Sequence, residues 1–115
     1  MAFPSTYNFS YYKGDTYQFV LRPKNSSGSS FNLTGYTAEF FIASSRGDNP
    51  VFSVEAEAIV SAENNIVTCT VLPGVGSTLD AGSYVYDVQI TSGISNVFTL
   101  VTGTITVTEQ VTGAA

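Results

Sequence analysis

The sequence predicts an all-β protein, an antiparallel β-sandwich of about seven strands, with a small closed barrel as the alternative. Apolar and polar residues alternate with a period of two along most of the chain, which is the period of one strand face. Clusters of Gly, Pro, Asn, Asp and Ser separate these alternating stretches at short intervals, as turns do between strands.

The chain of 115 residues has the size of one domain. We expect a single sandwich domain over residues 13–110, preceded by an aromatic N-terminal arm or edge strand over residues 1–12. Residues 111–115 are expected to form a loose C-terminal tail.

The alternating stretches place the strands in order along the chain. The connection between residues 73 and 82 is long enough to hold one helical turn, which we expect near residues 77–79. Strands are expected over residues 16–22, 36–44, 51–55, 58–61, 66–72, 83–91 and 96–108.

The last strand changes its apolar face near its middle. Phe98 and Leu100 precede Gly103 on one alternation, whereas Ile105 and Val107 follow it on the other. A β-bulge inserts one extra residue and reverses the faces, and a glycine inside a strand often marks such a site. We therefore expect a β-bulge at Gly103.

The segment from Leu79 to Tyr84 refines the fold class. Gly82 allows a tight entry into the strand, and a tyrosine two residues later can donate a hydrogen bond back to the upstream backbone. This Leu-x-x-Gly-x-Tyr spacing is typical of a tyrosine corner, a feature of Greek-key sandwiches. The expected architecture is therefore an immunoglobulin-like Greek-key sandwich, with Gly82, Tyr84 and Gly103 as structural residues.

Composition argues against several classes of function. The chain has four cations against nine carboxylates and a net charge of −5, which argues against nucleic-acid binding, because such binding needs clustered Lys and Arg. No apolar run approaches the length of a membrane span. The N-terminus has neither the basic start nor the apolar stretch of a signal peptide, so synthesis in a cytoplasm is expected.

The residues that usually carry catalysis are scarce. The chain has no His, the commonest general base and zinc ligand, and its one Cys, Cys69, alternates with valines as a buried residue does. We therefore predict a protein that is not an enzyme, with no cofactor and no metal site.

Apolar residues on the outward strand faces are the candidates for protein contact. If several of them converge on one sheet, they form a patch of the kind that marks a protein partner. The N-terminal arm is the second candidate, since it either packs on its own sandwich or adds to the sheet of a neighbouring subunit. The predicted interface residues are Phe3, Tyr7, Phe9, Tyr11, Val20, Phe41 and Val85.

Five short motifs, taken in order, resemble a known family. The chain is similar to the small immunoglobulin-like β-sandwich modules of tailed-bacteriophage virions, such as the N-terminal domain of baseplate upper proteins and capsid decoration or cement domains. The resemblance covers residues 12–112 and rests on Lys13-Gly14-Asp15-Thr16, Asn32-Leu33-Thr34-Gly35-Tyr36-Thr37, Gly47-Asp48, the stretch from Gly82 to Val88 and the stretch from Gly103 to Thr108.

The resemblance implies a non-catalytic structural protein of a phage virion. The first expectation is a capsid decoration or cement protein that docks on the major capsid protein or on other virion proteins, with a homo-oligomer left open. A tail or baseplate accessory protein that orients receptor-binding proteins is the alternative. A carbohydrate-binding or adhesin module is the second alternative, which coplanar exposed tyrosines would favour and buried tyrosines would disfavour.

Overall fold

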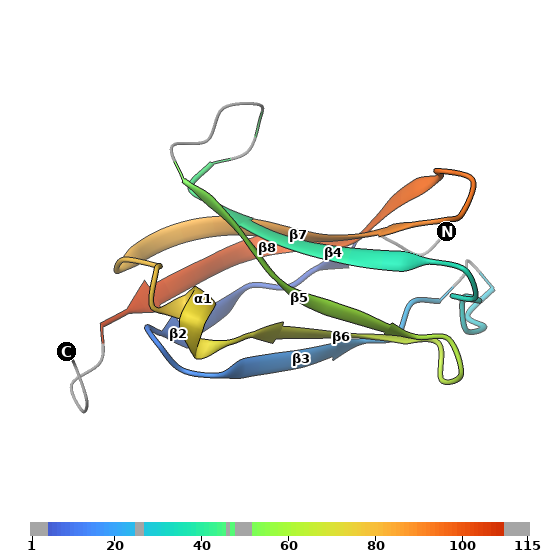
Figure 1. Cartoon of the computed structure of the whole chain (residues 1–115), viewed down its shortest axis with the longest axis horizontal. Coiled ribbons are helices and arrows are strands. Elements are labelled where there is room, and N and C mark those ends of the chain that lie inside the picture. The colour runs from blue at the N-terminus through green and yellow to red at the C-terminus, as the bar shows by residue number, and fades with distance from the viewer. Residues whose placement is uncertain (1–4, 25–26, 46, 48–51, 110–115) are drawn as a thin grey trace.

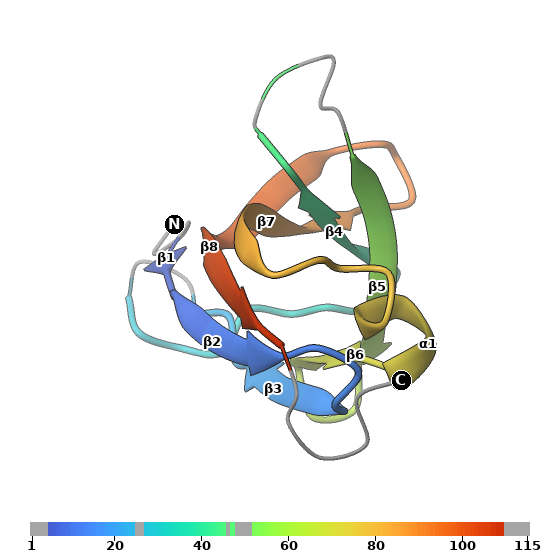
Figure 2. The ribbon, with the colours of Figure 1, turned by 90° about the vertical axis from the view of Figure 1, so that its left-hand side faces the viewer.

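A computed structural model describes residues 5–24, 27–45, 47 and 52–109 of the chain. They form an all-β fold in which one mixed sheet curls around a single core (Figures 1 and 2). The strands follow the order β1-β8-β7-β4-β5-β6-β3, and β2 also pairs with β8. The elements are β1 (Ser5–Thr6), β2 (Phe9–Tyr12), β3 (Tyr17–Leu21), β4 (Thr37–Ala43), β5 (Ser53–Ser61), β6 (Ile66–Val71), α1 (Pro73–Gly76), β7 (Gly82–Thr91) and β8 (Val97–Thr108).

The sequence had predicted an antiparallel fold, but the sheet is mixed. The two short N-terminal strands, β1 and β2, run parallel to β8, whereas every other named pair of strands is antiparallel. Parallel strands need a long connection to bring the chain back to the same end of the sheet. The segment between β2 and β8 is long enough, because it contains all the other strands from β3 to β7.

Strand β5 joins two parts of the curled sheet, which we call the first and second leaf. Its residues from Ser53 to Ala56 pair with β4, and those from Glu57 to Ser61 pair with β6. The first leaf thus contains β1, β2, β8, β7, β4 and the start of β5; the second contains the rest of β5, β6 and β3. The sequence had predicted two strands here, but no Gly or Pro interrupts the alternation, so one strand bends through both leaves.

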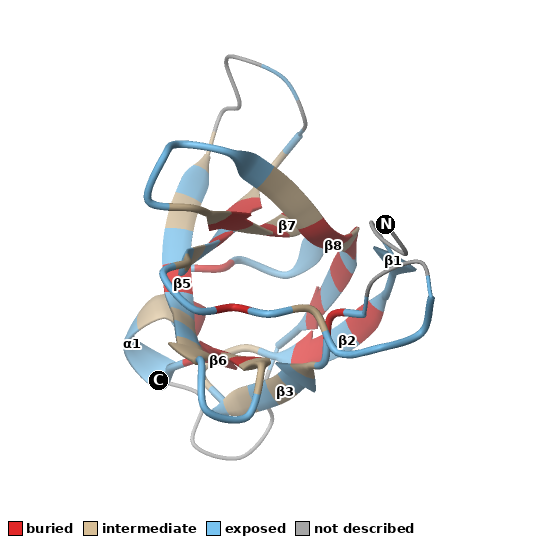
Figure 3. Cartoon of the chain, turned by 90° about the vertical axis from the view of Figure 1, so that its right-hand side faces the viewer, coloured by how far each residue is buried: buried red, intermediate tan, exposed pale blue. Residues whose placement is uncertain are grey.

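The core lies inside the curl, where the apolar faces of both leaves meet (Figure 3). In β4 and β7 the buried residues alternate with more exposed ones, as the period of two predicted. Leu33, from the connection between β3 and β4, fills the same core. The largest fully buried side chains are Tyr86, Phe40, Leu33, Ile42, Leu79, Ile90, Ile105, Val67, Val71, Val88, Val101 and Cys69.

The β-bulge in β8 lies at Leu100, three residues before the predicted position. Val88 pairs with Val101 and Gln89 pairs with Thr99, so Leu100 is the extra residue. Leu100 and Val101 are consecutive and both buried, which accounts for the change of apolar face. Gly103 itself pairs regularly with Tyr86, and its small size serves a different purpose described below.

The helical turn also lies earlier than predicted. It forms α1, Pro73–Gly76, with proline in its first turn. Proline has a fixed φ and lacks an N–H, which suits the start of a helix. Among the described residues, no helix is long and apolar enough to span a membrane.

Candidate functional site

The N-terminal arm packs on its own sheet. In β2, Phe9 lies opposite Ile105 and Tyr11 opposite Val107, in parallel register with β8. Phe9 is 9% exposed and Tyr11 only 2%, so both belong to the core. The prediction that Phe9 and Tyr11 form a docking surface is therefore corrected: the inward face of β2 is covered by the chain's own strands. Tyr7 stays 40% exposed, and Phe3 lies outside the described residues.

The arm reaches β8 at Gly103, where its backbone crosses very closely. The Tyr7 N–H donates to the Thr102 carbonyl at 3.1 Å, and the Thr104 N–H donates to Asn8 Oδ1 at 2.9 Å. The hydroxyl of Tyr86 donates to the Tyr7 carbonyl. A Cβ at Gly103 would lie 2.8 Å from the Tyr7 carbonyl carbon, closer than such atoms approach. Gly103 is thus the residue that admits the arm.

Aromatic rings close the curl between β2 and β3. Phe9 stacks on Tyr17, with ring centroids 4.4 Å apart, and lies 5.6 Å from Phe19. The hydroxyls of Tyr7 and Tyr17 also share a hydrogen bond, which joins the N-terminal arm to β3. Within the described residues, no backbone ladder joins β2 to β3, so these rings carry the closure (Figure 2).

The buried tyrosines and the cysteine keep their protons at neutral pH. Burial, followed by the hydrogen bond with Tyr7, raises the pKa of Tyr17 to about 12. Burial also raises the pKa of Tyr86 and Tyr11, which leaves both hydroxyls as donors. Burial raises the pKa of the Cys69 thiol to about 12, so this thiol is a packing group rather than a nucleophile.

The predicted outward apolar residues do not converge on one leaf. Phe41 and Val85 lie on the outer face of the first leaf, on β4 and β7. Val20 lies on the second leaf, opposite Thr68, which is itself opposite Ile59. Because the sheet curls, the outer faces of the two leaves point in different directions (Figure 3). Phe41 and Val85 therefore lie on a different surface from Val20.

The first leaf presents an aromatic ring between two carboxylates. Phe41 lies directly opposite Glu55 on β5 and directly opposite Asp87 on β7. We call these three residues the Glu55–Phe41–Asp87 row. Phe41 is 42% exposed, a large fraction for a phenylalanine in the interior of a sheet. The arrangement offers an apolar surface with negative charge on both sides.

A shallow hollow borders this row on the side toward the end of β4. Its lining combines apolar groups with one carboxylate, and it is open to solvent. In the described part of the chain, the hollow is lined by Phe41, Ala43, Ser45, Gly47, Val85, Tyr86 and Asp87.

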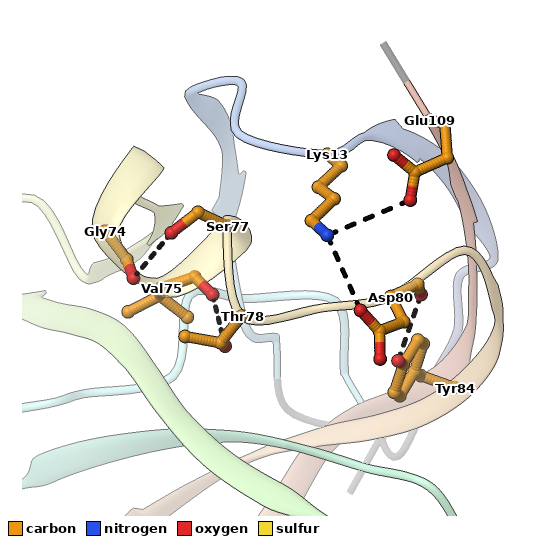
Figure 4. A network of polar contacts seen from close by, with 8 residues as sticks. All are labelled: Lys13, Gly74, Val75, Ser77, Thr78, Asp80, Tyr84 and Glu109. Atoms are coloured by element: carbon orange, nitrogen blue, oxygen red, sulfur yellow. Dashed lines mark hydrogen bonds and ion pairs between the residues drawn. The ribbon is translucent and has the colours of Figure 1, made fainter. Parts of the chain in front are cut away.

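Tyr84 makes the hydrogen bond that the sequence predicted for it. The Tyr84 hydroxyl donates to the carbonyl of Asp80 at 3.0 Å (Figure 4). Gly82 has φ of +144° at the start of β7, a conformation that side chains disfavour. The Asp80 carboxylate also lies 3.5 Å from the Lys13 ammonium, which lies 3.8 Å from Glu109 (Figure 4). These contacts join the ends of β2 and β8 to the connection before β7.

The sequence did not predict three apolar residues that the structure exposes. Ile59 and Val97 are half exposed, and Ile94 is 81% exposed at the tip of the turn between β7 and β8. The turn is held by the Ser92 side chain, which accepts a bond from the Asn96 N–H, and by Ser95 at φ of +68°. An isolated isoleucine among turn residues was the available signal for Ile94.

No family model matches the chain, and no curated protein sequence matches it. Among the described residues, no group of three or more His, Cys, Asp or Glu side chains could hold a metal ion.

Proposed function

We propose that this chain is a non-catalytic structural protein of a tailed-bacteriophage virion, a decoration or cement protein that docks on the capsid lattice. The observation that carries the docking role is the exposed Phe41 with Val85 beside it on the open face of the first leaf. Val85 is half-buried and lines the same hollow as Phe41, and apolar groups that share an accessible surface are typical of protein interaction sites. The virion setting rests on the resemblance of the five sequence motifs.

We also propose that the fold is an immunoglobulin-like Greek-key sandwich. The connection from β3 to β4 and the connection from β6 to β7 each pass from the second leaf to the first. Strands β4, β5 and β6 are consecutive neighbours and β3 lies beside β6, which is the strand order of a Greek key. The hydrogen bond from Tyr84 to Asp80 supports the same architecture.

Burial of the tyrosines favours protein docking over sugar binding. Tyr11 and Tyr86 are buried, and the hydroxyl of each is engaged by backbone. Among the described residues, the two exposed tyrosines are Tyr7 and Tyr12. They lie beside Thr102 and Thr108 of β8, a separation of roughly 20 Å along a strand. That spacing does not give the flat pair of rings on which a sugar stacks.

A copy count in purified particles tests the proposed function. Quantitative mass spectrometry would compare the amount of this chain with that of the major capsid protein. An amount comparable to the capsid protein supports decoration, because a site repeated around a shell is occupied many times. A small fraction of that amount would support the tail or baseplate alternative instead. Absence of the chain from particles would overturn a virion role.

A further inference from the structure

We propose that the Glu55–Phe41–Asp87 row binds an arginine of a partner protein, whose guanidinium lies over the Phe41 ring. This inference rests on the proposed docking function and names the chemistry of the partner segment. It makes the first leaf the docking face and leaves the second leaf, with Val20, facing solvent.

The register of the strands sets the geometry of this site. Residues directly opposite each other in antiparallel strands have Cβ atoms about 4.5–5.5 Å apart. Phe41 therefore has one carboxylate-bearing residue on each side at that spacing. A guanidinium within about 6 Å of the ring centroid is attracted by the ring and can also donate to a neighbouring carboxylate.

The hollow beside the row suits the aliphatic part of the same side chain. Ala43 lies directly opposite Val85, and this pair is two residues along the strands from the pair of Phe41 and Asp87, on the same face. Both line the hollow together with Phe41 and Asp87. An arginine entering over Val85 would bury its methylene stem there and bring its charged end to Phe41.

Charge complementarity selects a cationic occupant. Glu39, two residues before Phe41, adds a third carboxylate to the outer face of β4 and is exposed. The described cations Lys13, Arg22 and Lys24 lie outside the strands. A second copy of this chain, with a net charge of −5, would bring further negative charge to this face, so a copy is a poor occupant.

Arginine fits the row better than lysine. The guanidinium is planar and less strongly hydrated, so it stacks on an aromatic face while its edge donates to carboxylates. A lysine ammonium is a compact, hydrated point charge that cannot do both from one position.

The test is an NMR titration of the isotope-labelled protein with a short probe peptide, acetyl-Gly-Arg-Gly-Arg-Gly-amide. The matched control peptide has citrulline in place of arginine, which keeps the shape and removes the charge. The variants are Phe41→Ser, the double variant E55Q/D87N, and Val20→Ser as a control on the second leaf. The amide spectrum of each variant reports whether it is folded. Because Arg46 follows Ser45 in the sequence, R46Q is included to remove the chain's own nearby cation.

The expected result is saturable shifts confined to Phe41, Val85, Asp87 and their strand neighbours. We expect citrulline, F41S and E55Q/D87N each to weaken binding at least tenfold, and V20S and R46Q to bind as tightly as the wild type or tighter. Equal binding of the citrulline peptide, equal shifts around Val20, or no binding would overturn the proposal. The titration and the copy count test different proposals. If the chain is abundant in particles but does not bind the peptide, the proposed virion function stands and the arginine site is wrong.

Discussion

Replacing Gly103 with alanine tests whether the N-terminal arm can pack against β8 only because residue 103 has no side chain. The new Cβ would lie 2.8 Å from the Tyr7 carbonyl carbon and 2.9 Å from Asn8 Oδ1. Both neighbours are held in place, Asn8 by the Thr104 N–H and Tyr7 by the hydroxyl of Tyr86. The arm must therefore shift away from β8.

The size of the effect follows from what the arm buries. Adding a methyl group to a packed site typically costs about 1–3 kcal/mol. Complete detachment would expose Phe9 and Tyr11, whose burial contributes about 1.5–3 kcal/mol each, so a shift is the less costly response. We expect G103A to lower the free energy of unfolding by about 1–3 kcal/mol, which lowers Tm by roughly 4–12 °C for a chain of this size.

Thermal and urea denaturation, followed by circular dichroism, would measure this change. Gly93→Ala is the matched control, because nothing lies within 4 Å of a Cβ there and its φ is not in the left-handed region. We expect G93A to stay within about 0.5 kcal/mol of the wild type. If G103A is as stable as G93A, the close crossing of the arm over β8 is wrong.

Three further predictions concern individual hydroxyl and thiol groups. Tyr84→Phe should lower the free energy of unfolding by about 0.5–1.5 kcal/mol in urea, through loss of the bond to Asp80, while Tyr12→Phe should change nothing; equal effects would contradict the corner. Stability should fall as the pH rises from about 9 to 12, because the folded chain holds the Cys69 proton and the protons of Tyr11, Tyr17 and Tyr86 at pH values where the unfolded chain loses them. Tyr17→Phe should reduce the slope between about pH 10 and 12, and an unchanged slope would contradict the raised pKa of Tyr17. Cys69 should be inert to a thiol reagent at pH 8 until denaturant is added, and rapid labelling of the native protein would show that it is not buried.

The strands of the core were predictable because their signal is local. Alternation alone identifies β4 and β7, since one face of each is buried and every second residue must be apolar. The hydrogen bond from Tyr84 to Asp80 was predictable for the same reason, because the two residues lie within four positions of each other.

Long-range pairing could not be predicted in the same way. The parallel pairing of β2 with β8 joins residues almost a whole chain apart, so Phe9 and Tyr11 looked like surface residues of an arm. The true role of Gly103, admitting that arm, is likewise invisible in a local pattern. Phe41 was found from its outward position in the alternation, but its two carboxylate neighbours depend on the register with β5 and β7.

Rebinding to particles that lack the chain tests most directly whether it docks on a protein lattice through the first leaf. Purified wild type, F41S and V20S would each be added, and the bound copies counted by mass spectrometry. We predict equal binding of wild type and V20S and at least tenfold weaker binding of F41S, because Phe41 lies on the docking face and Val20 on the second leaf. Failure of the wild type to bind would contradict docking on the particle, and equal binding of F41S would contradict docking through the first leaf.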